Sequence, residues 1–335
     1  MVKLEILLLA NNVVLPFQQF KKEYGLEFID LNRIFATQSI AEHGLGFFIN
    51  VYENNKTDNP IKKIIFDTGG PNSTFLHNLD VRKIDVNDTD IIILSHWHYD
   101  HSRGLYEILR RIGKNIPIIC HENALLERFF IRSQDVKVKD LIGKTREDLQ
   151  ILLSSSKIVN QAPIDIRKVE ELNGNVVFSK EAYEILNIEG LKIVASGEIP
   201  RNNKYEDFSN FMFLQDNVIK YDKIIDDKCL IIELEDRVIL LNGCCHSGII
   251  NTLNYVKKLT NKPISHIIGG FHMVSASDER MTETIDFLTK FQTYNRPLYL
   301  FPIHCSGEKF GNMINETKNE NLLALNASVG TKFLF

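Results

Sequence analysis

IIILSHWHYDHSRGL, residues 91–105, carries four potential metal ligands within six positions, directly after an aliphatic run of strand character. The four are His96, His98, Asp100 and His101. In an extended chain, positions i, i+2 and i+4 project to the same side, so the first three are expected to converge. Imidazoles and a carboxylate together suit zinc, iron, cobalt or manganese. A polar turn that happens to be rich in histidine is the alternative, and this density of ligands favours a metal site.

The composition is that of a globular protein with a substantial core. Of the 335 residues, 44% are hydrophobic and 24% are charged, and the formal net charge is -4. This balance gives no basic footprint, which argues against a nucleic-acid partner. No stretch approaches the roughly 18–20 apolar residues that a membrane helix needs. The N-terminal run MVKLEILLLANNVVLP fits a first strand better than a signal peptide.

Five cysteines form an odd and unevenly spaced set, namely Cys120, Cys229, Cys244, Cys245 and Cys305. Such a set fits reduced thiols in a cytoplasmic protein better than a disulfide framework. The last three flank expected metal ligands and are candidates for reactive thiols. Packing as small buried residues is the favoured interpretation for them.

Strand and helix patterns alternate along the chain in two blocks. In the first block, strands are expected at residues 2–9, 46–53, 61–66, 91–94 and 116–120. A helix is expected over residues 103–112, with Ser102 as its N-cap and Gly113 as its C-cap. In the second block, strands are expected at 228–234, 237–242, 264–268 and 297–303, and helices at 249–258 and 277–290.

The pattern changes between the two blocks. A charged helical stretch, DLIGKTREDLQILL, falls within residues 131–160, and strand patterns resume at 175–178 and 191–196. Two halves that each run from strands to helices predict an α/β fold in which two sheets pack face to face with helices outside. We expect a single domain over residues 1–335, with 125–225 as an insertion or cap within it.

The second block supplies further candidate ligands at strand ends. His246 lies in GCCHSG (243–248) after one strand, and His304 lies in FPIHC (301–305) at the end of another. Loops held by a rigid sheet are where chemical groups are usually mounted. Six candidate ligands therefore form two sets: His96, His98 and His246 around one ion, and Asp100, His101 and His304 around another.

The HxHxDH pattern at 96–101, preceded by a strand and by FDTGG at 66–70, resembles the metallo-β-lactamase superfamily. GCxH at 243–246 and the late His304 complete the pattern in order, so the resemblance covers nearly the whole chain. It implies an αββα sandwich of two mixed sheets with the site at one edge. It also implies the two ligand sets given above. Asp67 is implied as a buried carboxylate that fixes histidine tautomers and orients the metal-binding loop.

Five further segments carry a narrower resemblance: AEHGLGFFI (41–49), SGEIPR (196–201), GCCHSGIINT (243–252), GGFH (269–272) and PIHCSG (302–307). They are similar to the subgroup labelled dihydropterin ribofuranosylaminobenzene-phosphate synthase-like. That label belongs to archaeal proteins of a methanopterin pathway. Many relatives with the same motifs are known only as metal-dependent hydrolases.

One departure from the superfamily pattern bears on the metal count. Most dinuclear members carry a bridging Asp after the strand that follows the third motif, but Gly269 and Gly270 stand there in this chain. Loss of that negative bridge predicts one or two divalent ions, with the first ligand set the more secure. Zinc is the expected metal, with iron, manganese or cobalt as alternatives. His272 would enter the ligand shell, face the substrate or be structural.

The ligand set favours hydrolysis as the reaction. A divalent ion lowers the pKa of bound water toward about 7, so that hydroxide is available for attack on a carbonyl or phosphoryl centre. Asp100 would orient that water or take its proton. His98 stands where a glutamate would have indicated a di-iron redox site, which favours hydrolysis over electron transfer.

Five polar residues are candidates for the substrate pocket: Glu42, His43, Glu198, Arg201 and His272. The first two precede a strand in a glycine-containing turn, and stabilising that turn is their alternative role. Arg201 suits a phosphate or carboxylate group. A structural ion pair is the alternative for Glu198 and Arg201.

The leading functional hypothesis is a cytoplasmic metal-dependent hydrolase, a lactonase, esterase or phosphodiesterase that acts on a small molecule. A pterin-pathway transferase or synthase is the second hypothesis, and it would need a basic, aromatic-lined pocket with Arg201, Phe47 and Phe208 as candidates. A nuclease-like phosphodiesterase is the third, but the insertion shows no basic arm. A non-catalytic metal-binding protein would require ligands that no substrate can reach.

Overall fold

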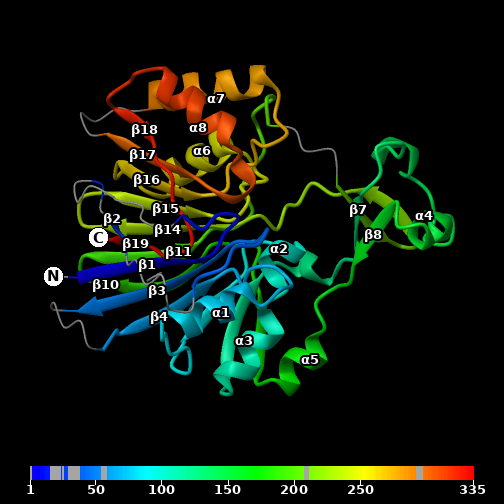
Figure 1. The fold of residues 1–335 in the computed structure, drawn as a ribbon, viewed down its shortest axis with the longest axis horizontal. Helices are drawn as coiled ribbons and strands as arrows, with labels where there is room; N and C mark the ends of the chain where they lie inside the picture. Colours follow the sequence, from blue (N-terminus) through cyan, green and yellow to red (C-terminus); the bar gives the residue numbers. More distant parts are fainter. Residues whose placement is uncertain are drawn as a thin grey trace.

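Two β-sheets packed face to face, with helices on both outer faces, form the body of the computed structural model (Figure 1). The structure describes residues 2–15, 24, 26–28, 38–53, 59–206, 211–291 and 297–335. Both sheets mix parallel and antiparallel strands. The predicted αββα sandwich is therefore confirmed.

The first sheet has eight strands among the described residues. In order across the sheet they are β2 (Leu26–Phe28), β19 (Thr331–Leu334), β1 (Val2–Ala10), β3 (Gly46–Glu53), β4 (Lys62–Phe66), β5 (Ile91–Ile93), β6 (Ile116–Cys120) and β9 (Gly174–Phe178). The run from β4 to β9 is parallel, and the other pairs are antiparallel.

The second sheet has seven strands in the part of the chain that the structure describes. In order they are β10 (Tyr183–Ile188), β11 (Leu191–Ala195), β14 (Cys229–Leu234), β15 (Val238–Asn242), β16 (Ile264–Gly269), β17 (Leu298–Pro302) and β18 (Leu322–Ala324). Strands β15 to β18 are parallel, whereas β10, β11, β14 and β15 pair antiparallel.

Helices cover the outer face of each sheet, because each presents one apolar stripe to it. The first sheet carries α1 (Thr74–Val81), α3 (Leu105–Ile112) and α5 (Ile166–Glu171), and the second carries α6 (Ile249–Leu259), α7 (Asp278–Phe291) and α8 (Glu308–Glu316). In α3 the buried residues are Leu105, Ile108, Leu109 and Ile112, at positions i, i+3, i+4 and i+7. Figure 1 shows the two groups of helices on opposite sides of the sandwich.

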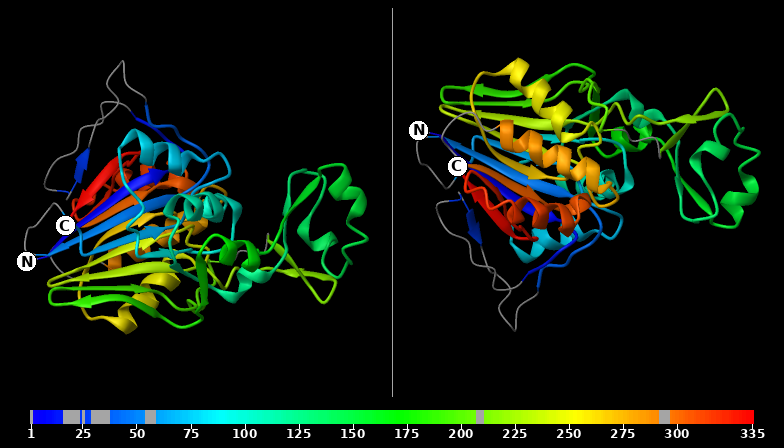
Figure 2. Two further views of the ribbon diagram at one scale, coloured as in Figure 1. Left: turned by 90° about the horizontal axis from the view of Figure 1, so that it is seen from below. Right: turned by 90° about the horizontal axis from the view of Figure 1, so that it is seen from above.

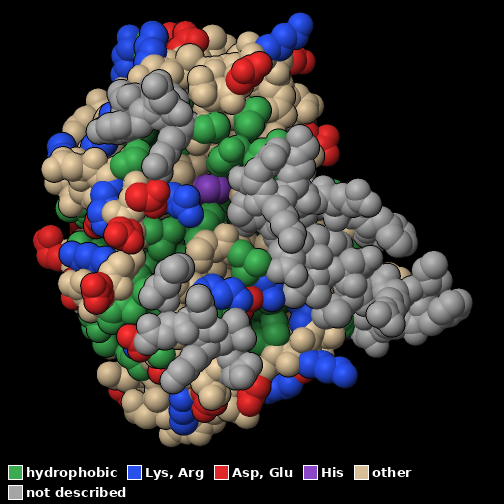
Figure 3. All heavy atoms as spheres, turned by 90° about the vertical axis from the view of Figure 1, so that its left-hand side faces the viewer, with side chains coloured by type: hydrophobic (Ala, Val, Ile, Leu, Met, Phe, Trp, Pro, Cys, Tyr) green, Lys and Arg blue, Asp and Glu red, His purple; other side chains and the backbone are tan. Residues whose placement is uncertain are grey.

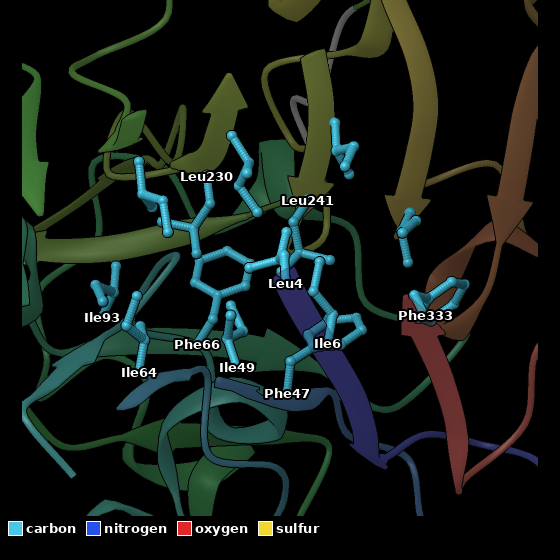
Figure 4. Packing of buried hydrophobic residues seen from close by; sticks show 14 of the residues in the cluster. Leu4, Ile6, Phe47, Ile49, Ile64, Phe66, Ile93, Leu230, Leu241 and Phe333 are labelled. Atoms are coloured by element: carbon cyan, nitrogen blue, oxygen red, sulfur yellow. The ribbon is translucent and has the colours of Figure 1, made fainter. Parts of the chain in front are cut away.

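The main core lies between the sheets (Figure 4). Strand β1 is buried on both faces: Leu4, Ile6 and Leu8 point between the sheets, whereas Leu7 and Leu9 pack toward the outer helices. This arrangement follows from the period of two in a strand, whose outer face also carries Lys3 and Glu5 at its start. Phe47, a candidate for an aromatic substrate pocket, is instead fully buried in this core.

A separate four-stranded sheet extends away from the sandwich (Figure 2), and we call it the arm. Its strands, in order, are β13 (Val218–Tyr221), β12 (Met212–Gln215), β7 (Arg128–Ile131) and β8 (Ile158–Gln161). It has a small core of its own, built on Phe129, Leu141, Leu149, Ile158, Met212 and Ile219.

The expected insertion over residues 125–225 is therefore only partly separate from the body. Strands β9, β10 and β11 fall within that range but belong to the two main sheets. Strand β9 pairs with β6, and β11 pairs with β14. The arm therefore consists of chain segments that precede β9 and follow β11. The role of the arm as a cap stays a prediction.

Two local expectations were wrong. Of the helical stretch at 140–153, only α4 (Gln150–Ser154) overlaps a regular α-helix, because Gly143 adopts a left-handed φ of 83° and breaks the run. Ser102 does not cap α3. It lies in α2 (Tyr99–Ser102), where its hydroxyl donates to the His98 carbonyl at 2.8 Å. Gly113 does end α3, with a φ of 64°.

Figure 3 shows the end of the sandwich at which the two chain termini lie. Acidic and basic side chains are interspersed among the described atoms on that face, with hydrophobic side chains between them. None of the helices in the described ranges is long and apolar enough to cross a membrane.

Candidate metal centre

The six predicted ligands lie together at one edge of the sandwich, where strands of both sheets end. His96 and His98 follow β5, and Asp100 and His101 lie in α2. His246 follows β15, and His304 follows β17 in a short 3-10 turn. None of the six side chains is more than 8% exposed. The carboxyl ends of strands from both sheets thus present these groups to one interior point.

Three imidazoles form the first group. The ring centroids of His96 and His98 are 4.4 Å apart, and each lies 4.8 Å from the ring centroid of His246. The Nε2 atoms of His96 and His98 are buried without a hydrogen-bond partner among the described residues. Burial lowers the pKa of all three rings, that of His98 to about 3, so they are neutral. Neutral imidazole is the form that binds a metal ion.

Asp100, His101 and His304 form the second group. His304 Nε2 lies 3.1 Å from Asp100 Oδ2 and 3.2 Å from His101 Nε2. One ligand atom from each of these residues, together with Cys244 Sγ, lies within 4.8 Å of all the others. The structure thus brings together both sets that the sequence proposed, and it adds a thiol to them.

Asp67 sets the orientation of two of the histidines. The carboxylate is fully buried, and its Oδ2 accepts from His101 Nδ1 at 2.6 Å and from the Ser95 hydroxyl at 2.7 Å. The Ser95 oxygen in turn lies 2.9 Å from His96 Nδ1. Because the hydroxyl donates its proton to Asp67, the His96 Nδ1–H must donate to Ser95. Both rings therefore turn Nε2 and its lone pair into the site.

We expect Asp67→Asn to weaken metal binding about 10–100-fold, because the amide no longer fixes these tautomers. Competition with a chromogenic chelator would measure this affinity. Asp90→Asn is the matched control, since Asp90 also accepts a backbone N–H, that of Lys63 at 2.7 Å, but contacts no candidate ligand. Equal affinities of both variants would contradict the role given to Asp67.

Two asparagines hold His304 in place, and the sequence did not predict this role for them. Asn11 Oδ1 accepts from the His304 backbone N–H at 3.1 Å, and Asn12 Oδ1 lies 3.1 Å from His304 Nδ1. An amide oxygen is an acceptor, so the proton sits on Nδ1 and the Nε2 lone pair faces Asp100 and His101. Their place directly after the aliphatic run of β1 was the available signal, because polar residues at strand ends often serve a site.

The second group concentrates negative charge around His101. Burial alone would lower the pKa of His101, but the carboxylates of Asp67 and Asp100 raise it to about 9. Burial alone would raise the pKa of the Asp100 carboxyl, but His101, His304 and His43 hold it well below its usual value. The groups that stabilise a proton on His101 can equally stabilise a metal cation bound in place of that proton.

The backbone around the site adopts an uncommon conformation. Asp67, Cys245, His272 and His304 have φ values of 58°, 61°, 50° and 57°, in the left-handed region that non-glycine residues rarely enter. Each such residue costs on the order of 1–3 kcal/mol, which the surrounding structure must offset. Eight further non-glycine residues among the described ones have a positive φ, so this conformation by itself does not mark the site.

Two of the five pocket candidates reach the metal centre. His43 Nε2 lies 3.3 Å from Asp100 Oδ2, and its ring stacks on His304 at a centroid distance of 4.7 Å. The His43 side chain is 52% exposed, so it connects Asp100 to solvent. The His272 ring lies 4.3 Å from that of His246.

Glu42 and Glu198 have structural partners instead. Glu42 accepts from the backbone N–H groups of Gly70 and Asn72, each at 3.1 Å, which is the turn-stabilising role. Glu198 accepts from His121 Nε2 at 2.9 Å, a structural contact in line with its alternative role.

Arg201 supports the loop that carries His246. Its guanidinium donates to the backbone carbonyls of His246 and Ile224. These two contacts use only part of its five N–H donors, so binding of an anionic group by Arg201 stays a prediction. Phe208, a further aromatic candidate, lies outside the described residues.

A buried ionic network joins the arm to the metal-binding loops. Arg128 at the start of β7 donates to Asp222 at 2.7 Å and to Asp226 at 2.6 Å, and all three side chains are at most 2% exposed. Asp226 also accepts from the backbone N–H of Trp97, between His96 and His98. Adjacent Asp227 accepts from the N–H of Ser247 at 2.8 Å, next to His246.

A cavity of about 670 Å³ is lined by residues of the arm. Its lining combines aromatic, aliphatic and basic side chains, namely Phe130, Ile131, Val136, Lys137, Val138, Lys139, Phe211 and Tyr221. The rings of Phe130 and Phe211 lie 5.3 Å and 5.1 Å from that of His98. This volume is in the range of small-molecule binding sites.

Comparison with known proteins identifies two relatives from one organism. The chain is 28% identical over 298 residues to a protein of Methanocaldococcus jannaschii named 7,8-dihydropterin-6-methyl-4-(beta-D-ribofuranosyl)-aminobenzene-5'-phosphate synthase; the match covers 88% of this chain and 90% of the relative. It is 29% identical over 282 residues to an uncharacterized protein of the same organism, with 83% and 90% covered.

A solved structure shares the fold. Tm1679, described as a metal-dependent hydrolase of the beta-lactamase superfamily, superimposes with a TM-score of 0.65 at 19% identity, over 98% of each chain. Residues 59–181 match the model of the metallo-beta-lactamase superfamily. That segment contains both FDTGG and HxHxDH, and the rest of the chain completes the sandwich around them, so the chain has the metallo-β-lactamase fold and resembles that superfamily in these motifs.

Proposed function

We propose that the protein is a metal-dependent hydrolase that cleaves an ester, lactone or phosphoester of a small molecule. The observation that carries the proposal is the convergence of five buried imidazoles and the Asp100 carboxylate, with the Nε2 atoms of His96, His101 and His304 turned inward. Imidazole and carboxylate ligands suit zinc, with iron, manganese or cobalt as alternatives. We expect one or two ions.

Each group of ligands has its own task in this proposal. His96, His98 and His246 would hold one divalent ion, and Asp100, His101 and His304 a second. Bound there, the metal would lower the pKa of water toward about 7 and polarise the oxygen of the scissile group.

We assign to Asp100 the role of accepting the proton of the attacking water. Its carboxyl is ionised, because His101, His304 and His43 hold its pKa well below the usual value. As an anion it can accept a hydrogen bond from a water molecule and orient it. So low a pKa makes it a weak base, so it would take the proton only from water that a bound metal has made acidic. His43, 3.3 Å from Asp100 and half-exposed, is placed to pass that proton to solvent.

The cavity beside His98 indicates the kind of substrate. Phe130, Phe211 and Tyr221 offer aromatic faces, and Lys137 and Lys139 are exposed cations at the same cavity. A small molecule with a flat apolar part and an anionic group would match both features. We expect neither a nucleic-acid nor a membrane partner. The buried free cysteines suit a reducing compartment such as the cytoplasm.

A transferase or synthase acting on a phosphorylated aromatic molecule is the second candidate. The specific observation in its favour is the aromatic and basic cavity, combined with the printed name of the relative, an aminobenzene-phosphate synthase. Transfer and hydrolysis differ in the acceptor that attacks, so the same ligands serve either reaction.

The test is a substrate panel with metal-stripped protein as control. Lactones, aryl esters, phosphodiesters and phosphotriesters would be assayed together with metal analysis of the protein as purified. We expect turnover that is lost on chelation and restored by zinc, iron, manganese or cobalt. Turnover that survives complete removal of metal would contradict the proposal, and a phosphodiester-only profile would indicate nuclease-like chemistry.

A further inference from the structure

Cys244 lies where the two ligand groups meet. Its Sγ is 3.0 Å from His101 Nε2 and within 4.8 Å of ligand atoms of Asp100 and His304. The same Sγ lies within 4.8 Å of ligand atoms of His96 and His246 in the other group. Among the described residues, it is the only member common to these two groups.

The two glycines at the expected bridging position leave no room for a bridging carboxylate. A Cβ at Gly270 would lie 2.5 Å from the Gly243 carbonyl oxygen, 2.7 Å from Cys305 Sγ and 2.9 Å from Cys244 Cα. A Cβ at Gly269 would lie 2.2 Å from the Asn242 carbonyl oxygen. Neither position has room for a carboxylate: the backbones of Gly243 and Cys244 and the Cys305 side chain fill the space at Gly270, and the Asn242 backbone fills it at Gly269.

We infer that Cys244 is a metal ligand shared by the two groups, which supplies the negative charge that the missing bridging Asp would have carried. The inference rests on the proposed metal site. A thiolate carries the same charge as a carboxylate and is a strong ligand for zinc, iron and cobalt. On binding, the S–H bond breaks, the proton passes to solvent, and sulfur–metal bonds form.

The surroundings of Cys244 do not favour a packing role. Cys245, the next residue, packs in the apolar cluster between the second sheet and its helices, and its Sγ lies 3.6 Å from Thr252 Oγ1. Cys244 belongs to none of the four apolar clusters of the described residues. The left-handed backbone of Cys245, with a φ of 61°, separates the directions of the two side chains.

Cys305 is the competing thiol. It is grouped with Cys244 and His272 but with no ligand of the two main sets. Its Sγ donates to the Cys244 carbonyl at 3.4 Å. If Cys305 were the only thiolate ligand, no negatively charged ligand would be common to the two main groups.

Cobalt(II) substitution tests the inference without relying on activity. Thiolate bound to cobalt gives a charge-transfer band in the near ultraviolet, and its intensity is read while cobalt is titrated into the metal-free protein. We expect the wild type to bind two ions per chain with this band. Cys244→Ser should lose the band, and its second ion should bind at least about tenfold more weakly, as expected on losing a group that holds the metal.

Matched variants separate a ligand from a structural residue. Cys245→Ser and Cys305→Ser should keep both the band and the two affinities. Cys244→Asp should bind the second ion with near wild-type affinity but without the band, because the carboxylate restores the charge and not the sulfur. Far-ultraviolet circular dichroism of each metal-free variant confirms that it is folded.

Three results would overturn the inference. Loss of the band in Cys305→Ser but not in Cys244→Ser would assign the thiolate to Cys305. Two bound ions without any band in the wild type would exclude a sulfur ligand while leaving the metal site intact. Binding of no ion at all would instead refute the proposed function on which the inference rests.

Discussion

Replacement of Asp100 by asparagine is expected to lower kcat/KM for a hydrolysed substrate by about 10²–10⁴-fold, the usual contribution of a positioned general base. Asparagine keeps the shape of the side chain but cannot accept a proton from water at neutral pH. It also removes the charge that His101, His304 and His43 surround. The loss should therefore fall mainly on kcat.

The matched control is Asp88→Asn, because the Asp88 side chain is 77% exposed and lies outside the site. Metal content per chain is measured for both variants by atomic absorption. Asp100→Asn with full metal occupancy and unchanged kcat would remove Asp100 from the proton-transfer step. A lower metal content in Asp100→Asn would show that the loss of activity comes mainly from the loss of a metal ligand.

Replacement of Arg128 by methionine is expected to cost about 3–5 kcal/mol of unfolding free energy, because breaking a buried ion pair from one side leaves uncompensated charge. Here two carboxylates, Asp222 and Asp226, would lose their cation while staying at most 2% exposed. Methionine preserves most of the apolar volume, so the effect reports charge more than packing. Urea unfolding followed by fluorescence of Trp97 would measure it.

Arg146→Met in the same arm is the control. Arg146 pairs with Glu127, but its side chain is 44% exposed, and such surface pairs contribute about 0–1 kcal/mol. Similar, small losses in both variants would mean that solvent or rearrangement compensates Asp222 and Asp226 in the absence of Arg128. A large loss for Arg128 alone would establish that the arm is anchored by charge.

Most strands and helices could be predicted because their patterns are local. Strand β3 spans the expected residues 46–53, and the helix before Gly113 ends at the expected glycine. An alternating run indicates that one face of a strand is buried, and a continuous aliphatic run indicates that both faces are covered by another layer. The prediction failed at 140–149, where a helical period was present but Gly143 adopts a left-handed φ and the chain forms turns until α4 begins at Gln150.

The candidate ligands could also be found from the sequence, since each follows a strand directly. Their partners could not. Asn12 and His304 are 292 positions apart, and Trp97 and Asp226 are 129 apart. No local pattern links such residues, because their contact depends on how the two sheets are stacked.

The sequence by itself determined the type of fold, the identity of the candidate ligands and their placement at strand ends, since these follow from the periodicity of neighbouring residues. Only the tertiary structure decided how the ligands are oriented and what lies between them. The tautomers fixed by Asp67, the shared position of Cys244 and the burial of Arg128 arise from contacts across the chain. Such contacts exist only once the conformational entropy of the intervening segments has been lost on folding, so no short stretch of sequence encodes them.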